Sequence, residues 1–156
     1  METDAGCVMD DTEVTVRLPA AGADVLSIHA LLHRMGGWDA SGAHDIAPNV
    51  DGYEVLMPNG FGRFAGIANM NFRPVVTLAF GHYHSLTCTL GHTLYRPDGV
   101  SVTVRDLQPR DWLATGSGKR TRLTAIHDSD RVEQVYTLFE VTGDRYITNG
   151  LISGTH

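Results

Sequence analysis

The sequence is short of cysteine, of positive charge and of long apolar runs, and these shortages limit what the protein can be. Its two cysteines, Cys7 and Cys88, permit at most one bridge. Twelve lysines and arginines against 18 aspartates and glutamates give a net charge of −6 without a basic block, which disfavours nucleic-acid binding. No run approaches the roughly 20 apolar residues of a membrane span, and the acidic start METDAG lacks the apolar stretch of a signal peptide. We therefore expect a soluble cytoplasmic protein whose cysteines are free thiols.

Glycine, in contrast, is abundant. The 156 residues include 17 glycines and 6 prolines, and 42% of the chain is hydrophobic. This length suits one domain with a moderate core, and the glycine content favours short strands joined by turns.

About ten short runs have the alternation or β-branched composition of strands, with turn signals between them, which predicts an all-β fold. Asn149-Gly150 is expected to be one of the turns. A bulge is expected at Gly66. The runs lie at 13–18, 53–57, 61–70 (a short strand pair), 74–80, 85–90, 93–107, 108–115, 120–130, 135–141 and 145–153.

Two segments depart from the strand pattern. Residues 21–35 place apolar side chains at helical spacing, from Val25 to Met35, which predicts a short amphipathic helix. Residues 36–52 are rich in Gly, Pro, Asn and Asp, which indicates a loop.

The stretch TCTLGH at 87–92 combines a hydroxyl and an imidazole where a strand gives way to a turn. Thr89 and His92 are three residues apart, so both side chains can reach one point beyond the strand end. The pattern is compatible with an ordinary polar turn or with a small site.

Four stretches resemble the sequence blocks of inteins. CVMDDTEVTVR at 7–17 is similar to the opening block, TCTLGH at 87–92 to the Thr-x-x-His block, and 135–156 to the closing blocks, which contain Asn-Gly before the splice junction. YEVLMPNGFGRFAGI at 53–67 resembles phage-type inteins. A homing endonuclease would need a hundred or more further residues. The resemblance therefore implies a mini-intein on the all-β, horseshoe-shaped Hint fold.

This resemblance assigns roles to four residues. Cys7 would attack the carbonyl of Gly6 and convert the amide into a thioester, because sulfur is the most nucleophilic side-chain atom at neutral pH. Gly6 offers little steric resistance to attack or distortion. His92 would protonate the scissile nitrogen as it leaves, and Thr89 would be a hydrogen-bond partner beside it.

The closing blocks depart from the intein pattern. Thr137 stands where an Asp is usual, and Asp144 where a His is usual. Asp144 could act as an acid or base, or be a solvated turn carboxylate. No Asn follows His156: either His156 is the penultimate His, or Gly154 and Thr155 replace the usual His-Asn. We expect a chain altered or truncated at its C-terminus that cannot complete Asn cyclisation.

The resemblance also implies a division of the chain. Residues 1–6 would be an upstream extein remnant or tag, and 7–156 the splicing domain. Splicing needs no cofactor, the partners are the flanking exteins in cis, and the chain is expected to be a monomer. It would act once on itself and not as a turnover enzyme.

Two other interpretations stay open. The chain could be a small all-β binding module with zinc on its histidines: His29 and His33 lie four apart on the predicted helix, and His82 and His84 lie near Cys88 or His92. It could also be a related Hint domain that cleaves without ligating. The thiol of Cys7 discriminates the module from the autoprocessing domains, which require it.

Overall fold

The computed structural model describes residues 6–36 and 46–155, and these form thirteen strands, one α-helix and two short 3-10 turns. Every strand pairing among them is antiparallel. The expectation of an all-β fold is confirmed.

The strands form three sheets. The first has the order β2 (Ala23–Ser27), β1 (Glu13–Arg17), β4 (Glu54–Met57) and β5 (Gly60–Arg63). The second has the order β10 (Trp112–Ala114), β11 (Arg120–Phe139), β6 (Gly66–Phe80) and β3 (Ile46–Pro48), with β7 (His84–Cys88) also on β6. The third has the order β12 (Arg145–Thr148), β13 (Leu151–Gly154), β8 (Thr93–Tyr95) and β9 (Ser101–Thr103).

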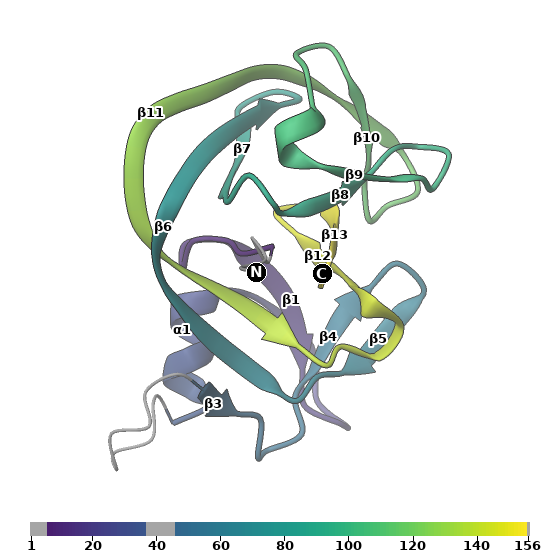
Figure 1. The fold of residues 1–156 in the computed structure, drawn as a ribbon. Coiled ribbons are helices and arrows are strands. Elements are labelled where there is room, and N and C mark those ends of the chain that lie inside the picture. Colours follow the sequence, from purple (N-terminus) through teal and green to yellow (C-terminus); the bar gives the residue numbers. More distant parts are fainter. Residues whose placement is uncertain (1–5, 37–45, 156) are drawn as a thin grey trace.

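Two long strands, β6 and β11, frame the molecule. They pair from Leu123 opposite Phe80 to Phe139 opposite Gly66, with three register shifts along the way. Such bulges bend a strand and increase its twist. The pair accordingly curves around one side of the fold (Figure 1).

A single cluster of buried apolar side chains fills most of the interior. Leucines from several strands are fully buried in it, among them Leu78, Leu86, Leu113, Leu123 and Leu138. Burial of this kind supplies most of the favourable free energy of folding.

Within residues 6–36 and 46–155, no helix has the length and apolar character needed to cross a membrane.

The helix predicted for 21–35 is wrong in its first half. Residues Ala23–Ser27 form β2, which pairs with all five residues of β1. The helix α1 covers only Ile28–Arg34, and the Ser27 hydroxyl caps it by accepting from the Ala30 N–H at 3.0 Å. Pairing with β1 satisfies the backbone groups of 23–27, so tertiary structure overrides a local helical spacing.

Two predicted boundaries also change. The predicted loop 36–52 includes strand β3, because Ala47 is buried and pairs with Ile67; residues 37–45 lie outside the described part of the chain. The runs predicted as separate strands at 61–70 and 74–80 largely join in β6, and those at 120–130 and 135–141 join in β11.

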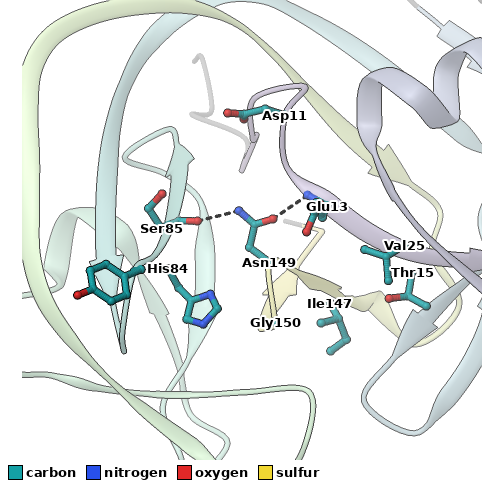
Figure 2. A pocket seen from close by; sticks show the side chains of 10 residues that line it. Asp11, Glu13, Thr15, Val25, His84, Ser85, Ile147, Asn149 and Gly150 are labelled. Carbon is teal, nitrogen blue, oxygen red and sulfur yellow. Dashed lines mark hydrogen bonds between the residues drawn. The ribbon is translucent and has the colours of Figure 1, made fainter.

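The turn predicted at Asn149-Gly150 joins β12 to β13. Both residues have positive φ, 48° and 87°, as a two-residue type I′ hairpin requires. The Asn149 side chain accepts from the Glu13 N–H and donates to the Ser85 carbonyl, each at 2.7 Å. Figure 2 shows this bridge at the wall of a polar recess also lined by His84. Asn149 thus ties the last hairpin to β1 and β7, which fixes the end of the chain relative to its beginning.

Candidate active site

The Gly6–Cys7 peptide bond lies inside the fold. Cys7 and Val8 are fully buried. Val8 bridges Cys88 of β7 and Tyr136 of β11, and it exchanges backbone hydrogen bonds of 2.9 and 2.8 Å with Tyr136. Because neighbouring strands hold the chain at residue 8, the peptide bond before it has a fixed place. Cys7 and Cys88 are not joined in a disulfide, as expected.

Thr89 fixes the peptide nitrogen of Cys7. Its hydroxyl accepts from the Cys7 N–H at 3.2 Å, and its own backbone N–H donates to the Cys7 carbonyl at 3.0 Å. Thr89 is 1% exposed. The chain then turns, with the His92 N–H donating to the Thr89 carbonyl at 3.2 Å. This tight turn is what brings Thr89 and His92, three residues apart, to the same peptide.

The imidazole of His92 faces Gly6. His92 is fully buried, and a Cβ built on Gly6 would lie 2.9 Å from its Nδ1. Nδ1 makes no hydrogen bond of standard geometry, whereas Nε2 lies 2.8 Å from the Ser153 hydroxyl. The structure therefore brings together Gly6, Cys7, Thr89 and His92.

Burial makes His92 a weak base. Loss of solvation lowers its pKa from 6.5 to about 4, and the weaker hydrogen bond with the Gly6 backbone acts in the opposite direction. The imidazole is therefore neutral at pH 7. A neutral ring can take a proton from a thiol, and the same ring, once protonated, is a strong acid toward a leaving nitrogen.

This low pKa predicts acid sensitivity. Between pH 6.5 and 4 the unfolded chain binds a proton at His92 that the folded chain does not. The stabilisation is complete above pH 6.5 and is lost as the pH falls toward 4, by about 3 kcal/mol. Urea unfolding of the chain and of His92→Gln across this range measures it. The free energy of unfolding should depend less steeply on pH in His92→Gln than in the unchanged chain. His29→Gln, at an exposed site, should match the unchanged chain. Equal slopes for the chain and His92→Gln would contradict the prediction.

Two hydroxyls that the sequence analysis missed lie behind His92. Ser153 of β13 bonds to His92 Nε2, and its Oγ lies 2.5 Å from Oγ1 of Thr148 on β12. Both residues are fully buried. Polar residues in an otherwise apolar closing hairpin were the one sequence signal for them.

Tyr146 is a third buried group that the sequence analysis missed. It is fully buried, and its hydroxyl makes no hydrogen bond of standard geometry. Burial raises its pKa to about 12; Thr137 and the Leu138 backbone act in the lowering direction and Cys7 in the raising direction. The phenol thus lies near Cys7, with Thr137 beside it.

Asp144 lies near the C-terminal end of the described chain. It is exposed, and its carbonyl accepts from the Thr155 N–H at 3.1 Å. It therefore lies beside the C-terminal end of β13, apart from the buried groups around Cys7. His156 lies outside the described residues.

The two ends of the described chain meet at one residue. A Cβ on Gly6 would lie 3.4 Å from the Thr93 nitrogen, and a Cβ on Gly154 would lie 3.2 Å from the Thr93 Cβ. Ser153 also pairs with Leu94 in the same sheet. Thr93 therefore lies close to both Gly6 and Gly154.

The histidines considered for zinc do not form a recognisable site. In the part of the chain that the structure describes, no three His, Cys, Asp or Glu residues are grouped to hold a metal ion. The zinc-linked binding module is therefore not favoured.

Comparison with known proteins places this fold. No family model and no curated protein matches the sequence. Among solved structures, the VidaL intein is similar with a TM-score of 0.76 and 16% identity, covering 97% of this chain and 98% of that one. A DnaB intein from Synechocystis sp. PCC 6803 gives 0.73 and 16%, covering 97% and 99%. The transcription factor IIB Mvu mini-intein gives 0.71 and 13%, covering 94% and 99%. The chain has the Hint fold of mini-inteins, and the resemblance is confirmed at the level of the fold.

Proposed function

We propose that this chain is a protein-splicing domain that acts on its own Gly6–Cys7 bond by an N-to-S acyl shift. The observation that carries the proposal is the buried Gly6–Cys7 peptide, with its N–H on Thr89 and its Gly6 side against His92. The fold shared with mini-inteins along almost the whole chain supports it. These side chains all come from one chain, so a monomer suffices.

The first step is an isomerisation, in which one bond forms and one bond breaks. The bond from Cys7 Sγ to the Gly6 carbonyl carbon forms, and the bond from that carbon to the Cys7 nitrogen breaks. The thiol proton ends on the freed amine. His92, whose Nδ1 faces this peptide, is the group proposed to transfer a proton to the nitrogen as it leaves.

The later steps would follow at the second junction. In this assignment residues 1–6 belong to the upstream extein, 7–156 form the splicing domain inside its host cell, and the acyl group passes to a nucleophile after the domain before C-terminal cleavage. Asp144, whose carbonyl holds Thr155, and His156 are the side chains proposed to serve that cleavage. The reaction occurs once per chain.

Intact mass of the full chain with and without hydroxylamine at neutral pH tests the proposal. Hydroxylamine cleaves thioesters, so the wild-type chain should lose the mass of METDAG over hours. Cys7→Ala removes the nucleophile and should stay whole, whereas Cys88→Ala, which removes the other thiol, should still cleave. An unchanged mass of the folded wild-type chain would overturn the proposal.

A further inference from the structure

Three buried groups form a continuous polar chain behind the scissile peptide. His92 Nε2 lies 2.8 Å from Ser153 Oγ, and Ser153 Oγ lies 2.5 Å from Thr148 Oγ1. All three residues have no exposed surface. They come from the turn before β8, from β13 and from β12. Buried polar hydrogens without an acceptor are costly, so the direction of each bond can be worked out.

One direction leaves a hydrogen without a partner. If Nε2–H donated to Ser153, the Ser153 hydroxyl would donate to Thr148. The Thr148 hydroxyl would then have no acceptor, since its side chain makes no other hydrogen bond among the described residues. Nδ1 would also turn a lone pair toward the Gly6–Cys7 peptide.

The opposite direction gives each hydroxyl hydrogen an acceptor. Thr148 donates to Ser153, Ser153 donates to Nε2, and the ring proton lies on Nδ1. The peptide that faces Nδ1 can only accept a hydrogen bond from the ring, because its own N–H is already donated to Thr89. What it offers the imidazole is the Gly6 carbonyl oxygen, which is an acceptor.

We propose that Ser153, oriented by Thr148, is a positioning residue that holds His92 in the Nδ1–H tautomer, with its proton directed at the Gly6 carbonyl. This rests on the proposed function for its chemical meaning. An Nδ1–H stabilises the negative charge that develops on the oxygen as Cys7 Sγ attacks. Because β13 leads to Thr155, the strand that ends at the second junction also sets the proton at the first.

Nitrogen-15 NMR of the histidine side chains at neutral pH tests the tautomer directly. In the folded wild-type chain we expect the His92 proton on Nδ1, with Nε2 as the unprotonated nitrogen. A proton on Nε2 would overturn the proposal. Ser153→Ala removes the donor to Nε2, so we expect it to shift the His92 proton toward Nε2. Thr148→Val leaves Nε2 as the one acceptor for the Ser153 hydroxyl, so it should keep the proton on Nδ1.

Cleavage kinetics supply the second readout. Ser153→Ala should slow hydroxylamine-dependent release of residues 1–6 about tenfold or more, whereas Thr148→Val should keep most of the rate. Ser117→Ala is the matched control, because Ser117 belongs to an exposed hydroxyl pair with Thr115 at 2.9 Å. Equal rates for the wild type and the folded Ser153→Ala variant would overturn the positioning role. The tautomer is read whether or not the chain cleaves. A wild type with Nδ1–H that never releases residues 1–6 therefore overturns the proposed function and leaves the tautomer assignment intact.

Discussion

Replacing His92 with glutamine is expected to slow the release of residues 1–6 by about 10²–10⁴-fold. Glutamine fills much of the same volume and can still donate to the Gly6 carbonyl and contact Ser153. It cannot protonate the leaving nitrogen. The loss should therefore fall on the rate and not on the fold. Intact mass against time in hydroxylamine gives the rate, and circular dichroism reports the fold.

The matched control for this substitution is His29→Gln. His29 lies on α1 with a mostly exposed side chain, and its replacement should leave cleavage unchanged. A His92→Gln chain that cleaves within about threefold of the wild-type rate would remove proton transfer by His92 from the mechanism.

Enlarging Gly6 is expected to have the second large effect. A Cβ there would lie 2.9 Å from His92 Nδ1 and 3.0 Å from the His92 Cα. The Cα belongs to the backbone, and the turn at 89–92 holds it in place. It cannot move away from an added Cβ without disturbing that turn. Gly6→Val should push the peptide out of line with both Thr89 and His92. A misplacement of about 1 Å costs roughly 10²-fold in rate, and we expect a loss of that order, with Gly6→Ala in between.

Gly22→Val is the comparison that separates crowding from a general effect of valine. A Cβ on Gly22 would meet no atom within 4 Å, so this variant should cleave normally. Mass spectrometry of the three variants side by side gives the order of rates. Cleavage of Gly6→Val at the wild-type rate would show that the peptide reacts in a conformation different from the one described.

Local patterns predicted the elements that are themselves local. The alternation at 13–18 predicts β1. Asn149-Gly150 predicts the turn between β12 and β13, because both residues tolerate positive φ. The helix predicted at 21–35 failed where the pairing of β2 with β1 decides the conformation. The continuity of β11 was hidden by polar residues between two strand-like runs, at a register shift between His127 and Arg131.

The candidate site divides in the same way. Cys7, Thr89 and His92 were found because their spacing within short motifs resembles a known family. Thr148, Ser153 and Tyr146 were missed because their importance comes from packing against residues far away in the sequence. A buried serine looks in sequence like any serine, and only the hairpin that carries Ser153 to His92 distinguishes it.

The contacts of the site join residues that are far apart in the sequence, so the site cannot form until late in the synthesis of the chain. Cys7 is organised by Thr89, 82 residues later, and His92 by Ser153, 61 residues later still. Ribosomes add about 5–20 residues per second, so a nascent chain carries its nucleophile for on the order of ten seconds before Ser153 has been synthesised. Through that interval Cys7 is an ordinary thiol beside an ordinary amide. In the proposed function, the upstream segment is thus protected from premature release until the splicing domain itself has been made.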